Sequence, residues 1–535
     1  RHPAVVPDSL HRDHRRARLH PRQLPRRDPD RGAAGRAEHG AGSLRARHQE
    51  RHGRAPEHHD RGLADHLLPD HRAARARPAL GADPREAHDL ALPALSRAGQ
   101  TAPTTTQSTG RTKMKHLTRL ALAGALALGT AGSAAAQEIY APNLSYRTGP
   151  FAATGIPLMN GQRDYIALLN ERDGGVGGVK IAYDECETGY NTEKGVECYE
   201  RTKAEAVVTQ PWSTGITLQV LPKTNTDEVP ILAPGYGFSA MAYGPVFQWA
   251  FNIPASYWDG ANMIMQYIAD GDMGSLAGKK IALLHLDHPY GKEPIPVLEA
   301  MAAAHGFELL LIPVGLSQMQ NQSSQWLQIR RERPDYVVMW GWGAMNASAI
   351  AEAVKTRYPM DQFIGIWWAS HDDDLAQQGE AAAGYKAISW SLPKPDAPLM
   401  AEIREHVIDA GLSDVENPNG VFYQRGLVIS MFLTEAIRTA QEHFGVAEVD
   451  ATQVRWGLEN LEITEERLEE LGMSGMVPPF STSCFNHTGH SGAWMLQWDG
   501  EKFVQVSDLL QADRELISTI EREAAMAYAE ANAPW

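Results

Sequence analysis

The feature that most constrains the fold is a repeated alternation of short apolar segments with longer amphipathic ones. The segments 280–286, 308–314 and 336–340 are apolar on both faces, which is typical of parallel strands covered by helices on each side. Between them, apolar residues recur at the spacing of a helix face. The alternation therefore predicts βαβ units and a doubly wound α/β fold.

This alternation occurs twice, with strands predicted at 138–144, 179–184, 229–233, 280–286, 308–314, 336–340 and 362–367, and helices at 191–208, 259–269, 290–305, 323–333, 346–357 and 420–444. A chain of this length exceeds what one core usually holds. We therefore expect two doubly wound parallel-sheet lobes joined by a hinge. The first is assigned to 137–256 with roughly 390–475, and the second to 257–389 with roughly 476–535.

A secretory leader is predicted ahead of the first strand. Residues 114–136 combine a basic start, an apolar run and a small-residue A-x-A site, the three parts of a signal peptide. Because such a leader is read near the start of a nascent chain, we expect residues 1–113 to be untranslated. The alternative is a disordered basic arm that binds nucleic acid. A mature protein beginning near Gln137 is expected in the periplasm, without a lipid anchor, because no Cys follows the apolar run.

Charge narrows the range of partners. The whole chain has a net charge of −15, but the part after the leader holds 26 Lys and Arg against 52 Asp and Glu, and is therefore more acidic. This balance argues against nucleic acid or an anionic membrane as a partner. No second apolar run is long enough to span a bilayer. We expect a monomer without a cofactor.

All three cysteines follow the predicted leader. The periplasm is oxidising, so a bridged pair is expected there. Cys186 stands at the end of the strand predicted at 179–184, two residues past its last position, and Cys198 lies on the next helix, which favours a Cys186–Cys198 disulfide. Cys484 is then expected to be a free, buried thiol, since no Cys/His signature surrounds it.

Several motifs, in this order and at this spacing, resemble type I periplasmic binding proteins, most closely the leucine/isoleucine/valine-binding branch that feeds ABC importers. They are the run 146–155 (YRTGPFAATG), Asn160-Gly161, Leu169-Asn170, Gly174-Gly175-Val176, Asp184-Glu185-Cys186, the run 210–215 (QPWSTG), Val229-Pro230, the run 288–291 (HPYG), the segment 419–433, the run 486–489 (NHTG) and Trp498-Asp499-Gly500. The resemblance covers nearly all of the chain after the leader.

The resemblance implies a ligand site in the crevice between the lobes. Hydroxyls and amides at a helix start, here Trp212, Ser213 and Thr214, hold the ligand's carboxylate, which agrees with the preference of helix N-termini for anions. Tyr290 corresponds to the aromatic residue that covers the ligand from the second lobe. Thr154 stands where amino-acid binders usually have a tyrosine, and Gly237 where they commonly have a threonine.

The remaining candidates come from the same loops. The acidic partner of a ligand ammonium falls near 371–373, with Asp372 as the candidate. Large rings crowd these loops and suit an aromatic or extended apolar ligand, or a cation over ring faces. They are Tyr146, Trp212, Tyr236, Phe238, Trp340, Trp342, Trp367 and Trp368. Of these, Tyr146, Trp212, Tyr236 and Trp342 are predicted ligand contacts.

Other motifs support no metal site and no enzyme. His285-x-Asp287-His288 and Cys484-x-x-His487-x-x-His490 lack a second ligand pair for zinc, and Asp372-Asp373-Asp374 lacks the distal Glu of a calcium loop. No G-x-S-x-G nucleophile motif is present. The expected function is a non-enzymatic receptor that binds a small amino acid or another small carboxylate and delivers it to an ABC permease. The alternative is a ligand-sensing receptor domain of the same fold.

Overall fold

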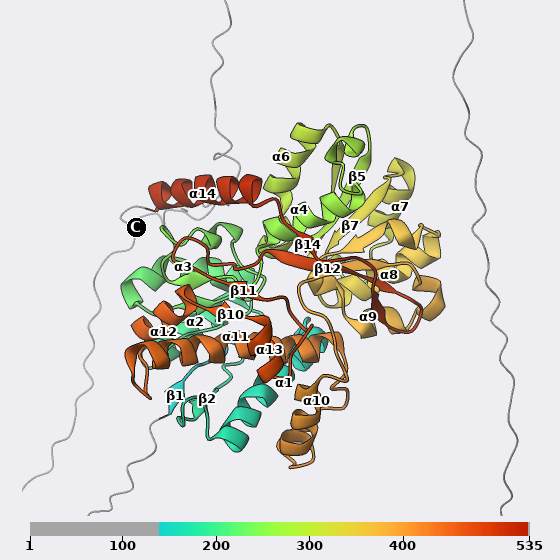
Figure 1. Cartoon of the computed structure of the whole chain (residues 1–535). Helices are drawn as coiled ribbons and strands as arrows, with labels where there is room; N and C mark the ends of the chain where they lie inside the picture. Colours follow the sequence, from blue (N-terminus) through green and yellow to red (C-terminus); the bar gives the residue numbers. More distant parts are fainter. Residues whose placement is uncertain (1–137, 533–535) are drawn as a thin grey trace, which may run out of the picture. The chain divides into compact units, whose positions relative to one another are not determined.

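The computed structural model describes residues 138–532, so the predicted leader and the segment before it lie outside the described residues. The first lobe (Figure 1) is built on a parallel sheet of short strands. These are β1 (Ile139–Tyr140), β2 (Ile181–Ala182), β3 (Ile231–Leu232) and β4 (Ala250–Phe251). β1 pairs with β2 and β3 with β4, and single bridges from Asn143 to Gln210 and from Thr209 to Ile231 join the two pairs. The predicted strands exist but are shorter than expected.

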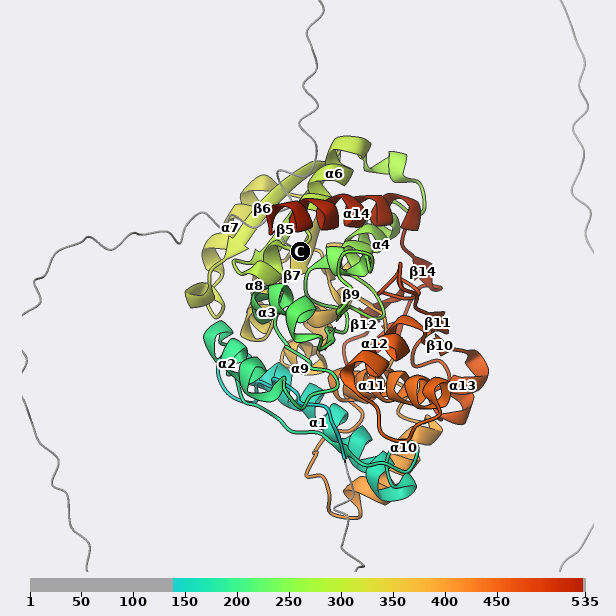
Figure 2. The same cartoon turned by 90° about the vertical axis from the view of Figure 1, so that its left-hand side faces the viewer.

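Helices cover the first sheet, and two of them pack unusually closely. The lobe contains α1 (Ala152–Leu168), α2 (Thr192–Thr202), α3 (Thr214–Asp227), α11 (Val421–Phe444) and α12 (Ala451–Glu459). α1 lies against α11 (Figure 2). A Cβ on Gly161 would clash with the carbonyl oxygen of Tyr423, and one on Gly426 with that of Leu158. Glycine at both positions therefore lets the two backbones approach each other.

The second lobe has a larger sheet, parallel for most of its width. Its strands are β5 (Lys280–Leu286), β6 (Glu308–Val314), β7 (Tyr336–Trp340), β8 (Phe363–Gly365), β9 (Lys386–Ser389), β12 (Gly492–Trp498), β13 (Phe503–Gln505) and β14 (Leu510–Gln511). The order β6-β5-β7-β8-β9 is parallel, whereas β12 joins β9 antiparallel and carries β13 and β14. The strands predicted at 280–286, 308–314 and 336–340 are confirmed, because their two-sided apolar pattern is the strongest in the chain.

The helices of the second lobe are α4 (Tyr257–Ile268), α5 (Pro289–Lys292), α6 (Ile295–His305), α7 (Ser323–Glu332), α8 (Ala344–Thr356) and α9 (Asp372–Ala376). The single helix predicted over 290–305 is wrong, since the structure divides it into α5 and α6. Pro294 and Pro296 stand at the start of α6, where the missing N–H groups cost nothing, whereas in a continuous helix they would break it.

The last part of the chain contacts both lobes. It contains α10 (Pro398–Ile403), β10 (Glu462–Ile463), α13 (Glu465–Glu470), β11 (Phe480–Ser481) and α14 (Arg514–Ala531). The ring of His487 stacks on that of Phe251 of β4, with the ring centroids 4.0 Å apart. The chain therefore still touches the first lobe beyond the boundary predicted at 476. α14 packs on α4 of the second lobe and on the short helix 239–242 of the first. Within residues 138–532, no helix is long and apolar enough to cross a membrane.

The predicted disulfide is present, but the third cysteine is not buried as predicted. Cys186 and Cys198 form a disulfide, with their Cα atoms 5.9 Å apart. Cys484 is free, but it is exposed, so the prediction of a buried thiol is wrong. Cys484 lies in the tight turn 483–486, which is closed by hydrogen bonds between Ser483 and Asn486. The turn faces solvent and leaves no core position for its side chains.

Reduction of the Cys186–Cys198 disulfide should lower the stability of the protein. Closing a loop with a sequence separation of 12 residues removes chain entropy from the unfolded state, which corresponds to about 2–3 kcal/mol. Urea unfolding of the oxidised protein, compared with a Cys186→Ser/Cys198→Ser variant, measures the difference. A Cys484→Ser variant is the matched control and should unfold at the same urea concentration as the parent protein. Equal stability of the double variant and the parent would contradict the prediction.

Candidate functional site

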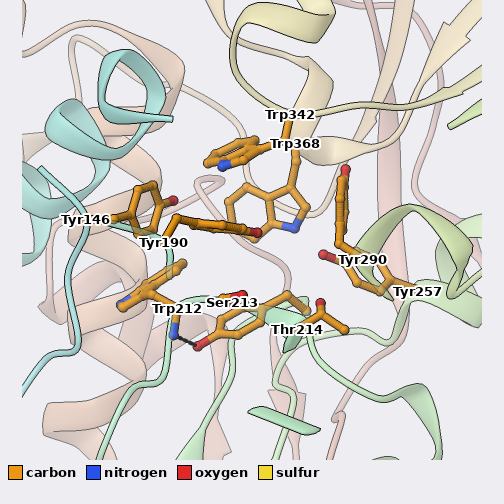
Figure 3. Close-up of a pocket in the computed structure, with 10 residues that line it drawn as sticks. Tyr146, Tyr190, Trp212, Ser213, Thr214, Tyr257, Tyr290, Trp342 and Trp368 are labelled. Atoms are coloured by element: carbon orange, nitrogen blue, oxygen red, sulfur yellow. Dashed lines mark hydrogen bonds between the residues drawn. The ribbon is translucent and has the colours of Figure 1, made fainter. Parts of the chain in front are cut away.

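One pocket is lined almost entirely by aromatic rings, which come from both lobes (Figure 3). Its lining residues are Tyr146, Tyr190, Trp212, Ser213, Thr214, Tyr236, Tyr257, Tyr290, Trp342 and Trp368. The space among them, counted out to where it opens to solvent, is about 280 Å³. No charged side chain belongs to this lining. The rings of Tyr146 and Tyr190 lie on one side, those of Tyr257 and Tyr290 on the other, and Trp342 and Trp368 close the top in this view.

The loops that follow the strands, together with the helix starts next to them, supply the lining. Tyr236 follows β3, Tyr290 lies on α5 after β5, Trp342 follows β7 and Trp368 follows β8. The carboxyl ends of parallel strands lie at one edge of a sheet, where ligands of such folds bind. Both sheets therefore present their loops to the same pocket.

Ring contacts join the two lobes across the pocket. Trp212 stacks on Tyr236 within the first lobe, with centroids 5.1 Å apart. Across the lobes, Trp212 lies 6.2 Å from Trp368 in an edge-to-face arrangement, and Tyr146 lies 6.3 Å from Trp342. The indole N–H groups of Trp367 and Trp368 both donate to the carbonyl oxygen of Gly235, at 2.8 and 3.2 Å. These contacts hold the lobes closed over the pocket.

The start of α3 supplies the main polar groups of the pocket. Ser213 is the N-cap of this helix, and its hydroxyl accepts a hydrogen bond from the backbone N–H of Ile216. Thr214, the first helical residue, is 2% exposed, and its Oγ1 has no hydrogen-bond partner among the described residues. The first N–H groups of a helix have no acceptor within the helix. A buried, unused hydroxyl beside such N–H groups is a site suited to an acceptor-rich or anionic group.

Two ionisable side chains near the pocket are largely neutral at pH 7. His288 lies beside the start of α3, where a Cβ on Gly215 would be 3.3 Å from its Cε1. Burial lowers the pKa of His288 to about 4. Glu293 accepts hydrogen bonds from the backbone N–H and the hydroxyl of Ser239, at 2.6 and 3.1 Å. Burial raises the pKa of Glu293 to about 8, and the bonds from Ser239 oppose this rise.

Seven of the predicted ligand contacts are brought together around this pocket: Tyr146, Trp212, Ser213, Thr214, Tyr236, Tyr290 and Trp342. Two others from the first lobe do not line it. The hydroxyl of Thr154 donates to the carbonyl oxygen of Phe151 at 2.9 Å, within the first turn of α1. Gly237 has a φ of +98°, and a Cβ there would point at Met241 and Thr217 rather than into the pocket.

Asp372, the predicted partner of a ligand ammonium, is used elsewhere. Its Oδ2 accepts a hydrogen bond of 2.8 Å from the backbone N–H of Val421, at the start of α11. Asp372 therefore caps a helix and does not line the pocket, and burial raises its pKa. The described part of the chain, residues 138–532, contains no cluster of three or more His, Cys, Asp or Glu able to hold a metal ion.

Three lining residues were not among the predicted contacts: Tyr190, Tyr257 and Trp368. Trp368 stands in a loop that the sequence marks as rich in large rings, so its position was available from the pattern. Tyr190 has a φ of +62° just before Asn191, the N-cap of α2, a conformation that no sequence pattern indicates. Tyr257 is the first residue of α4, where it resembles an ordinary core residue in sequence.

Comparisons with known proteins agree with this geometry. The model of a family described as periplasmic binding protein matches residues 138–502. A crystal structure from the Pseudomonas fluorescens group, described as an ABC transporter permease, is 35% identical with a TM-score of 0.68, over 74% of this chain and 97% of that one. A comparison with curated proteins found no match.

Two more distant structures share the fold. A branched-chain amino acid ABC transporter from Thermus thermophilus with bound valine is 21% identical with a TM-score of 0.60, over 71% of this chain and 98% of that one. A solute-binding protein of an ABC transporter from R. palustris, in complex with benzoate, is 16% identical with a TM-score of 0.55, over 70% of this chain and 97% of that one. With the fold, the family match and a relative at 35% identity in agreement, this chain belongs to the type I periplasmic binding proteins.

Proposed function

We propose that the protein is the solute-binding component of an ABC importer, and that it carries a small carboxylate with an aromatic or compact apolar body to a membrane permease. The family and its ABC-transporter relatives support the transport role. The aromatic lining of the pocket supports a small ligand that packs among ring faces. A periplasmic location agrees with the family and with the Cys186–Cys198 disulfide.

The observation that carries the ligand class is the unpartnered hydroxyl of Thr214 at the start of α3. Leaving a buried hydroxyl without a partner costs free energy that a bound acceptor would recover. A carboxylate placed here would accept from this hydroxyl, from Ser213 and from the free N–H groups of the first turn. Hydrogen bonds to a charged acceptor are stronger than neutral ones.

The size and walls of the pocket indicate the rest of the ligand. The small space left among the rings suits a compact body, one ring or a short branched chain, with a carboxylate attached. Ring faces and edges from eight aromatic side chains favour a flat apolar body. Valine and benzoate, the ligands of two related structures, are both compact carboxylates of this kind.

A free amino group on the ligand has no counter-charge in the pocket. Asp372 caps α11 instead, and no other carboxylate lines the cavity. A buried ammonium without a carboxylate would be costly. We therefore favour a simple carboxylate over an α-amino acid, and keep a branched-chain amino acid as the alternative ligand.

A panel of matched probes tests the ligand class. Thermal melting is measured with benzoate, phenylacetate and 3-methylbutanoate, with the amide of each, and with valine. A ligand at a hundred times its Kd stabilises the folded state by about 2.7 kcal/mol, which shifts the melting temperature visibly. We expect at least one carboxylate to stabilise the protein and its amide to do so much less. Stabilisation by valine alone would replace the proposed ligand class with an amino acid.

Replacing Tyr290 should weaken every ligand of this pocket. The Tyr290 ring lies 5.5 Å from the ring of Tyr257 and forms part of the wall from the second lobe. Loss of a central aromatic contact typically costs about 2 kcal/mol or more in binding, or roughly thirtyfold in affinity. Calorimetry with a carboxylate and its amide should show both weakened in Tyr290→Ala.

Tyr290→Phe is the matched control for this prediction. It keeps the ring and removes only the hydroxyl, which donates to the carbonyl oxygen of Gly341 at 2.9 Å. Its affinity should stay within a few-fold of the parent protein. Unchanged affinity in Tyr290→Ala would place the ligand outside this pocket.

A further inference from the structure

A fully buried cation lies directly behind the pocket wall. Arg425 of α11 is 0% exposed. Its guanidinium donates to the carbonyl oxygen of Trp367 and to the hydroxyls of Ser370, Ser389 and Ser391, with the bond to Ser389 measuring 2.7 Å. All four acceptors are neutral. The guanidinium is thus well hydrogen-bonded, but these bonds leave its charge uncompensated.

Within residues 138–532, no carboxylate forms an ion pair with Arg425. Burial lowers the pKa of Arg425 to about 9, and the charge of Asp372 acts in the opposite direction. The side chain is therefore charged at pH 7. A buried cation of this kind is costly unless something else stabilises it.

The charge is separated from the pocket by a single indole. The Cζ atom of Arg425 lies 5.4 Å from the ring centroid of Trp368, which lines the pocket. It also lies 5.1 Å from the ring of Phe422 and 5.2 Å from that of Trp390. Arg425 and the three aromatic side chains around it are all buried. Charge–charge interactions are therefore screened less here than at the surface.

Among the described residues, Asp372 is the acidic group that acts against the charge of Arg425, and it does not line the pocket. The lining itself contains no charged side chain, and burial keeps His288 and Glu293 largely neutral at pH 7. An aromatic enclosure alone would also suit a cation. A positive charge behind one wall makes a cationic ligand unfavourable and an anionic one favourable.

We propose that Arg425 is a specificity-determining residue that makes the pocket selective for anions without touching the ligand. This inference rests on the proposed function, because it concerns the ligand of the same pocket. At an effective dielectric constant of about 20, a unit charge behind one aromatic ring changes the affinity of an anion by roughly tenfold. A neutral ligand of the same shape is not affected by this charge.

The test is the ratio of affinities for a carboxylate and its amide, measured by calorimetry at pH 7 with the tightest pair of the probe panel. Arg425→Gln should lower this ratio about tenfold, whereas Arg425→Lys, which keeps the charge, should preserve it. Asp372→Asn removes the opposing charge, and its amide oxygen can still accept from Val421. This variant should raise the ratio. A purely structural role for Arg425 would weaken both ligands equally and leave the ratio unchanged.

The outcomes separate this inference from the proposed function. If the parent protein prefers the carboxylate, but neither Arg425→Gln nor Asp372→Asn changes the ratio, the inference is wrong and the proposed function stands. If no carboxylate of the panel binds the parent protein, the proposed ligand class fails and the inference fails with it. Should Arg425→Gln not fold, as judged by its melting curve, the increase expected in Asp372→Asn decides the matter alone.

Discussion

A Ser213→Ala/Thr214→Val variant is expected to lose its affinity for a carboxylate ligand by about a hundredfold or more. Each hydrogen bond to a charged acceptor is worth about 1.5–3 kcal/mol, and the variant removes two of them. The backbone N–H groups at the start of α3 remain, so binding is weakened and not abolished. The amide of the same ligand should lose much less. Calorimetry with the matched pair measures both effects.

A second threonine on the same helix provides a matched control for this prediction. Thr217 lies one turn further along α3, is also buried, and its Oγ1 also has no partner among the described residues, but it does not line the pocket. Thr217→Val should therefore leave ligand affinity unchanged. Thr214→Val alone should not destabilise the ligand-free protein, because it removes a hydroxyl that makes no hydrogen bond. Parent-like carboxylate affinity in the double variant would show that the anion site is not at α3.

Arg514→Met is expected to lower the free energy of unfolding by roughly 3 kcal/mol or more at pH 7, since it breaks a buried ion-pair network. Arg514 begins α14, and its guanidinium binds Asp259 of α4 at 2.5 Å and Glu521 at 2.7 Å. These carboxyl groups are 0% and 2% exposed. The hydroxyl of Ser256 also donates to Glu521, at 3.2 Å. Removal of the cation leaves the buried carboxylate of Asp259 without a counter-charge and takes two hydrogen-bond donors away from Glu521.

The loss should depend on pH in a defined direction. Burial raises the pKa of Glu521 to about 8 from an ordinary 4.5, and the charge of Arg514 opposes this rise. The folded state thus keeps a proton that the unfolded state has released, so stability falls as the pH rises through this window. Without Arg514 the folded pKa rises further. Urea unfolding should show a larger loss at pH 8.5 than at pH 5.5.

Arg522 supplies the matched control for this prediction. It lies on the same helix, is exposed and forms no ion pair in the described part of the chain. Arg522→Met should change stability by less than about 0.5 kcal/mol. If Arg514→Met lowered the free energy of unfolding by the same amount at every pH, the packing of the Arg514 side chain, and not its charge, would be what stabilises this junction.

The position of this network gives α14 a role in joining the lobes. Its first turn is anchored to Asp259 of the second lobe. Near its other end, the ring of Tyr528 lies 5.8 Å from Phe238 and 5.2 Å from Phe247 of the first lobe. The helix was not predicted. Its apolar residues recur at helical spacing, but α14 contacts elements more than 200 residues away, and local sequence holds no record of that contact.

The sequence predicts the fold best where the local pattern of apolar residues is strongest. Strands β5, β6 and β7 begin and end where the sequence indicates, because most of their residues are apolar and the two inner strands, β5 and β7, are buried on both faces. In the first lobe the strands are only two residues long, and the sheet is completed by single bridges at Asn143 and Thr209. Polar residues there interrupt the pattern, so the boundaries of the strands could not be read from it.

For the site, the sequence by itself determined the class of fold, and through it the edge of each sheet at which a ligand binds. It also determined the chemistry of α3's first turn, because a Ser-Thr-Gly start can offer hydroxyls and free N–H groups to an anion wherever the helix lies. These properties follow from local periodicity and from residue types, which short stretches of chain specify on their own.

Only the tertiary structure decided which of these groups face the same space. Asp372 caps α11, so a loop that carries three consecutive acidic residues contributes no charge to the pocket. Arg425, an unremarkable residue within an apolar helix, lies behind Trp368 as a buried cation. Both positions depend on how α11 of the first lobe packs against loops of the second. Such packing joins residues about 50 positions apart or more, and its energy comes from burial and long-range electrostatics, which no local pattern encodes.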